Sequence, residues 1–296
     1  MPWYLFLPLA SAIIYSLGSV FIKRSLTEGA TMDQSFHITN WVVALLFLPL
    51  FLFENQTVNW SLIWMPLVMG VIFFFGTWTT FLGIRIGDVS LVTPLMGTKV
   101  VFVAIGVVVT MGQMPSNSLW LAAIFTTLGI FLMGWRDFRS KATGMTFAIL
   151  ITLLSAALFG FSDVLVTWWA NDFGPMAFLT MSTLSVALCS FIMWIIQGRP
   201  GFSMPAAARK PTVLAGILIG LQAIGMGIAL SFFDDATGIN VVYASRGLWA
   251  IVLIGLFGVW LGNHERHTSG KTFWWRAVGT LFLTAAVIIA VLDRSA

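Results

Sequence analysis

Charged side chains are scarce in this sequence. Asp, Glu, Lys and Arg make up only 9% of its 296 residues, whereas an ordinary soluble domain carries about 25%. Hydrophobic residues make up 59% of the chain, and the mean hydropathy is +0.96. The apolar runs are long and unbroken, and they lack the alternation that is typical of membrane β-barrel strands. The composition therefore predicts an all-α, polytopic membrane protein.

Other absences exclude whole classes of function. Cys189 is the single cysteine of the chain, so an intrachain disulfide is impossible. The sequence offers no nucleophile–base pair and no cluster of metal-ligating residues, so we expect no enzyme, no metal and no cofactor. The basic residues are spread over short loops, which argues against a nucleic-acid partner. The expected partners are membrane lipid and a small-molecule substrate.

Ten apolar stretches predict ten membrane-spanning helices in the chain. The breaks between them are short and carry Gly, Pro, Asn, Asp or basic residues, which leaves no room for a soluble domain. The expected spans are residues 3–22, 38–53, 61–84, 89–111, 118–135, 144–169, 173–196, 212–232, 238–261 and 272–291.

The charges of the loops predict how these spans are oriented. Twelve of the 15 Lys and Arg residues lie in the odd-numbered loops or, as Arg276 does, near the start of the span that follows; the even-numbered loops have none, and the termini have only Arg294. By the positive-inside rule, the odd loops face the cytoplasm and both termini face outside. We therefore expect an integral protein of a bacterial cytoplasmic (inner) membrane.

The chain also repeats itself at a nearly constant spacing. Residues 11–15 (SAIIY) resemble residues 155–159 (SAALF) at an offset of 144. This offset predicts two halves of five helices each, residues 1–138 and 142–296. Because each half has an odd number of helices, the second half must insert upside down. Inverted repeats are typical of secondary transporters, in which the substrate binds near the midplane between the two repeats.

With these ten helices, two halves and short loops, the whole chain resembles the drug/metabolite transporter superfamily, in its EamA-like group. That family often ends its fourth and ninth helices with a Leu-Gly-Glu-like turn. The corresponding residues are Met111-Gly112-Gln113 and Leu261-Gly262-Asn263, and both lack the acid. The resemblance implies transport of small metabolites. It also implies cytoplasmic termini, and for the orientation we follow the loop charges instead.

Three charged residues lie well inside the predicted spans. Lys99 and Arg246 occupy corresponding places 147 residues apart, and a basic residue at such a depth costs about 2.5–3.5 kcal/mol on insertion scales. We expect both to line a central cavity and to hold a carboxylate or phosphate; the alternative is a structural role. Asp163, where the first half has Ser19, is expected to pair with Lys99 or Arg246, or to act as a gate or a proton site.

These residues point to a secondary active transporter that moves a small anionic or zwitterionic metabolite by alternating access, with a proton or ion as a candidate coupling partner. The alternatives are a flippase for lipids or lipid-linked groups, and a membrane receptor or assembly protein. Either a monomer or a homodimer is compatible with the sequence. For the tryptophans, contact with lipid is the alternative to a place in the cavity. Further residues expected to line the substrate site are Tyr15, Ser19, Trp78, Gln222, Tyr243 and Trp249.

Overall fold

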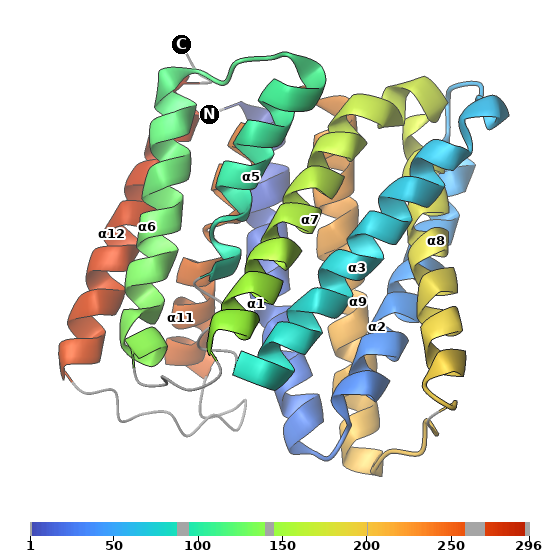
Figure 1. The fold of residues 1–296 in the computed structure, drawn as a ribbon, viewed down its shortest axis with the longest axis horizontal. Helices are drawn as coiled ribbons and strands as arrows, with labels where there is room; N and C mark the ends of the chain where they lie inside the picture. The colour runs from blue at the N-terminus through green and yellow to red at the C-terminus, as the bar shows by residue number, and fades with distance from the viewer. Residues whose placement is uncertain (1, 88–94, 140–144, 200, 258–269, 294–296) are drawn as a thin grey trace.

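A computed structural model of the protein describes residues 2–87, 95–139, 145–199, 201–257 and 270–293 (Figure 1). These residues form helices and no strand, so the predicted all-α class is confirmed. The α-helices are α1 (Phe6–Thr27), α2 (Met32–Phe47), α3 (Trp64–Gly87), α5 (Lys99–Gly106), α6 (Asn117–Arg139), α7 (Met145–Phe173), α8 (Pro175–Ile196), α9 (Ala206–Phe232), α10 (Ala236–Tyr243), α11 (Arg246–Phe257) and α12 (Gly270–Asp293). Short 3-10 helices are η1 (Trp3–Leu5), η2 (Leu48–Phe53) and η3 (Trp60–Leu62), and η4 (Val107–Met111) is a π-helix.

Six helical segments of the described chain are long and apolar enough to cross a membrane. They contain α1, α2, α3, α7, α8 and α9, and three shorter apolar segments lie in α5 with η4, in α6 and in α12. The polytopic membrane architecture predicted from the composition is therefore confirmed.

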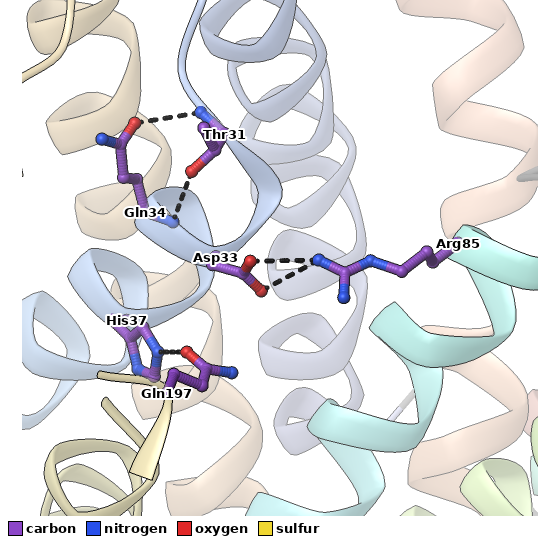
Figure 2. A network of polar contacts seen from close by, with 6 residues as sticks. All are labelled: Thr31, Asp33, Gln34, His37, Arg85 and Gln197. Carbon is purple, nitrogen blue, oxygen red and sulfur yellow. Dashed lines mark hydrogen bonds and ion pairs between the residues drawn. The ribbon is translucent and has the colours of Figure 1, made fainter. Parts of the chain in front are cut away.

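Several helices begin or end outside the predicted limits. The second span was expected to start at residue 38, but α2 starts at Met32. The reason is a capping box: the Thr31 side chain accepts a hydrogen bond from the Gln34 amide, and the Gln34 side chain accepts one from the Thr31 amide (Figure 2). Hydropathy detects the apolar part of a helix, whereas polar caps at its ends extend it beyond that part.

The fourth and ninth predicted spans, 89–111 and 238–261, are not single helices, which corrects the prediction. The first is interrupted at residues 97–98, immediately before α5, and the second at residues 244–245, between α10 and α11. Lys99 is therefore the first residue of α5, and Arg246 is the first residue of α11.

The two interruptions have the same hydrogen bonds. The Thr98 amide donates to the Leu95 carbonyl at 3.1 Å, and the Ser245 amide donates to the Val242 carbonyl at 3.1 Å. Each is a tight bond over three residues, as in a 3-10 helix. The corresponding donors and acceptors are 147 residues apart, which is the spacing of Lys99 and Arg246. Interrupted helices of this kind form the substrate sites of many transporters with inverted repeats.

The packing of the helices brings elements of the two predicted halves together. Helix α1 lies against α9, α3 against α7, and α6 against α12. In the order of the helices, α1 of the first half corresponds to α7 of the second, and α3 corresponds to α9. The α1–α9 pair therefore corresponds to the α3–α7 pair. In Figure 1, α1 and α7, the first helices of the two halves, run in opposite directions. Both termini lie at one face, which we call the terminal face, and the α1–α2 and α8–α9 connections lie at the opposite one, the basic face.

Glycines allow close contact between several of these helices. Gly216 and Gly220 face α2, where a Cβ atom on either would come within 2.9 Å of Val42 or 2.5 Å of Leu46. The GxxxG pattern of α9 therefore packs against α2 within one chain. At the basic face, polar contacts add to this packing: Arg85 binds Asp33 at 3.0 Å, and the buried His37 contacts Gln197 at 3.0 Å (Figure 2).

Candidate functional site

Lys99 and Asp163 form a buried ion pair in the middle of the helices. The Lys99 Nζ atom lies 2.6 Å from Asp163 Oδ2, and the two residues are only 8% and 6% exposed. Gly160, one helical turn before Asp163, brings α7 close to α5. A Cβ atom at Gly160 would lie 2.9 Å from Phe102 Cβ and 3.2 Å from the Lys99 carbonyl oxygen. Of the partners considered for Asp163, the structure thus selects Lys99.

Arg246 is held by aromatic rings instead. Its guanidinium carbon lies 4.7 Å from the ring centroid of Tyr15 and 4.7 Å from that of Tyr243. The Ser16 hydroxyl of α1 donates a hydrogen bond to the Arg246 carbonyl at 2.8 Å. Within the described residues, Arg246 has no carboxylate within ion-pair distance. Contacts between a cation and an aromatic ring are worth about 2 kcal/mol when desolvated, which does not replace a counter-ion.

These two sites correspond to each other residue by residue through the repeat. Lys99 Nζ lies 5.9 Å from the ring centroid of Phe159, and the offset of 144 relates Phe159 to Tyr15, the ring beside Arg246. The same offset relates Gly160, which touches the Lys99 carbonyl, to Ser16, which bonds the Arg246 carbonyl. The backbone and aromatic contacts are therefore alike on both sides.

The correspondence fails at one position. The same offset relates Asp163 to Ser19. The Ser19 hydroxyl donates to the Tyr15 carbonyl of its own helix at 3.0 Å, and it brings no charge to Arg246. Two cations and one anion, if all are ionised, leave one positive charge among these three groups, and Arg246 is the cation without a carboxylate at ion-pair distance within the described residues.

Tyr243 joins the two sites. Its ring lies near both cations: the centroid is 5.7 Å from Lys99 Nζ and 4.7 Å from the Arg246 guanidinium carbon. Its hydroxyl donates to Gln222 Oε1 on α9 at 2.8 Å, and its ring meets Tyr15 edge-on at 6.0 Å. Three predicted site residues, Tyr15, Gln222 and Tyr243, are thus brought together around the charged groups.

The two predicted tryptophans lie in different places. Trp249, on the first turn of α11, packs against the core cluster that contains Tyr243. Its indole N–H is buried and has no hydrogen-bond acceptor among the described residues. Trp78 lies elsewhere, in a separate cluster with Phe36 and Phe74. The structure does not place Trp78 with the charged residues, and its role in substrate binding stays a prediction.

Three residues of the site were not predicted from the sequence: Ser16, Phe159 and Gly160. A signal for them exists, because the repeat offset of 144 applied to Tyr15 leads directly to Phe159. Among the described residues, no group of three His, Cys, Asp or Glu side chains is arranged to hold a metal ion.

Comparisons with known proteins complete this description. The model of the EamA-like transporter family matches residues 1–135. No curated protein matches the chain. A solved structure described only as "Crystal structure of protein" aligns with a TM-score of 0.78 and 12% identity, over 98% of this chain and 96% of that one. At this identity, the likeness shows the fold alone. Of the two family-like turns, residues 111–113 begin with the last residue of the π-helix, and Gly112 follows at φ +65°. Residues 261–263 lie outside the described residues.

Proposed function

We propose that this protein is a membrane transporter that moves a small metabolite with one anionic group, a carboxylate or a phosphate, by alternating access. The match of residues 1–135 to the model of the EamA-like transporter family supports the transporter assignment. Arg246 holds the anion. Tyr15, Tyr243 and Gln222 shape the surrounding site, and Lys99 with Asp163 forms a neutral pair beside it.

One observation carries this proposal: Arg246 lacks the counter-ion that the corresponding Lys99 has in Asp163. A charge inside a membrane protein is costly unless it is paired. A substrate anion at Arg246 would complete the arrangement that Asp163 completes on the other side. The planar guanidinium also suits this task, because it binds a carboxylate or phosphate through two parallel hydrogen bonds.

The local backbone supports anion binding at the same point. Arg246 is the first residue of α11, and a helix N-terminus carries a partial positive charge of about half an elementary charge. Basic side chains are unfavourable at such a position, whereas an anion in front of it is stabilised. The buried indole N–H of Trp249, without an acceptor in the described residues, is a further donor nearby in sequence.

The Lys99–Asp163 pair supplies a means of coupling. A proton on Asp163 would neutralise the carboxylate and release the charge of Lys99, which lies 5.7 Å from the ring of Tyr243. The positive charge next to the substrate anion would then rise. A proton and the anion therefore strengthen each other's binding, which is the requirement for carrying the two together.

Uptake into proteoliposomes tests the proposal. The probes are radiolabelled pairs matched in size, a carboxylate or phosphate and its neutral amide or alcohol, with a lipid-linked phosphate added to test the flippase alternative. We expect an anion to be transported and its neutral analogue to be rejected. R246Q should abolish uptake, while R246K retains part of it. R209Q, at the basic face, is the matched control and should leave uptake unchanged. Equal uptake by R246Q and the native protein would disprove the assignment.

A further inference from the structure

A cavity lies at the terminal face, outside the charged site. Its volume is about 170 Å³, enough for several water molecules. One side is formed by η4 and the α5–α6 connection, and the other by α7 and the α9–α10 connection. Its lining residues are Val107, Met111, Gln113, Met114, Pro115, Leu119, Thr167, Asp234, Asp235, Ala236 and Thr237.

The cavity lies on the terminal-face side of the Lys99–Asp163 ion pair, along helices α5 and α7. Thr167 lines it and lies one turn of α7 above Asp163, whose carbonyl accepts the Thr167 hydroxyl at 3.3 Å. On the opposite wall, Val107 lies two turns above Lys99. A helical turn of four residues rises about 6 Å, so the cavity ends within one or two turns of the ion pair. Between them, Val103 is fully buried and closes the path.

Two features of the lining are not explained by packing. The first is Thr237, which is only 3% exposed, lines the cavity and makes no hydrogen bond through its hydroxyl within the described chain. Buried hydroxyls are normally paired with protein or water, so Thr237 offers a binding group to whatever occupies the cavity. The second is the π-helix η4, which contributes Val107 and Met111 to the wall. Single π-turns are frequent at functional sites.

The wall formed by the α9–α10 connection is rigid. Asp235 caps α10 by accepting the Gly238 amide at 2.9 Å, and it also accepts the Tyr4 hydroxyl at 2.8 Å. These bonds fix the wall that carries Thr237, so any movement that opens the path must come from the η4 side. A π-turn contains one residue more than the α-helix needs. Loss of the bulge would therefore rotate the residues beyond it by about 100°, the angle per residue of an α-helix.

We propose that this cavity is the outer vestibule of the transport path, that its occupant is the substrate in transit, and that η4 is the gate between the vestibule and Lys99. The inference rests on the proposed function. In the vestibule, Thr237 donates a hydrogen bond to the substrate. Re-forming η4 as α-helix rotates α5, with Val103 and Val107, relative to the α5–α6 connection and so carries both side chains out of the path to Arg246.

Cysteine labelling tests the vestibule without knowledge of the substrate. In a C189A background, T237C and M114C are treated with a small membrane-impermeant methanethiosulfonate from either face, and a tag at the C-terminus identifies the terminal face. We expect both to react at least tenfold faster from the terminal face. S190C, buried between α2 and α8, should not react. Two results would overturn the proposal of a vestibule. One is that M114C is labelled while T237C does not react, and the other is that T237C is labelled equally from both faces.

Transport measurements test the gate. Deleting Val109, an exposed residue of η4, removes the extra residue of the π-turn, and V109A is its control. With the anion that the uptake panel identifies, we expect the deletion to lower uptake at least tenfold at unchanged thermal stability, and V109A to be neutral. Normal uptake by the deletion variant overturns the gate while the proposed function stands. A panel without any transported anion overturns the proposed function, whereas the labelling result still decides whether the vestibule exists.

Discussion

The surroundings of Lys99 and Arg246 are two copies of one arrangement that differ in a single charge. Both cations begin a helix after the same tight turn, both lie over an aromatic ring, and both have their carbonyl against the neighbouring helix. Asp163 then neutralises Lys99, whereas Ser19 leaves Arg246 positive. The difference teaches that a repeated backbone can hold a structural pair on one side and a binding charge on the other.

The largest expected effect comes from removing one partner of the Lys99–Asp163 ion pair. D163A leaves Lys99 as an unpaired cation among buried groups, and removing one partner of a buried pair costs about 3–5 kcal/mol. Thermal unfolding of the purified protein in detergent measures this as a large fall in Tm. The double variant K99M/D163L removes both charges and should recover most of the loss.

The matched control is the exposed pair at the basic face. Arg85 and Asp33 also form an ion pair at 3.0 Å, but their side chains are 59% and 42% exposed (Figure 2). Exposed pairs contribute about 0–1 kcal/mol, so D33A should change Tm only slightly. Equal effects of D33A and D163A would show that burial does not distinguish the two pairs.

The second prediction concerns a substitution that gives Arg246 a carboxylate, as Asp163 gives one to Lys99. S19D adds the carboxylate that the repeat lacks and gives Arg246 an internal counter-ion. A hydrogen bond to a charged group contributes about 1.5–3 kcal/mol, so the new carboxylate should weaken binding of the substrate anion by about 10- to 100-fold. Equilibrium binding of the transported anion measures the effect.

S19N is the control for this substitution, because it has nearly the same shape without the charge. It should bind the anion within a few-fold of the native affinity. Native affinity in S19D would mean that the substrate anion is not held at Arg246.

The third prediction concerns the helix contacts beneath the two cations. G160A places a methyl group within 2.9 Å of Phe102 Cβ, and such overpacking costs about 1–3 kcal/mol. The corresponding S16A removes a hydroxyl that is shared between the Ala12 and Arg246 carbonyls, and a hydrogen bond of this kind is worth about 0.5–1.5 kcal/mol. Tm should therefore fall more for G160A. The reverse order would show that α7 can move away from α5 without cost.

The sequence predicts the charged residues of this site, but it does not predict how they are paired or where the helices are interrupted. Lys99, Arg246 and Asp163 stand out because a charge inside an apolar run is costly, so the cost itself marks them. Which cation Asp163 binds depends on how closely α5 and α7 approach, and Gly160 reveals that only in three dimensions. Hydropathy also misses the interruptions before Lys99 and Arg246, because each turn has only two residues, 97–98 and 244–245, and long apolar runs surround it. Trp78 shows the same limit, since composition does not say where a side chain points.

The smallest effect is expected at Tyr243, whose ring lies near both cations. Y243F keeps the ring beside Lys99 and Arg246 but leaves Gln222 without its 2.8 Å hydrogen bond, at a cost of about 1 kcal/mol. Y15F keeps the ring on the other side of Arg246, and its lost hydroxyl makes no hydrogen bond to the described residues, so Tm should not change. Anion affinity should stay within a few-fold in both variants, because both rings remain beside the guanidinium. A tenfold loss in Y243F alone would instead make its hydroxyl, rather than its ring, a direct contact of the substrate.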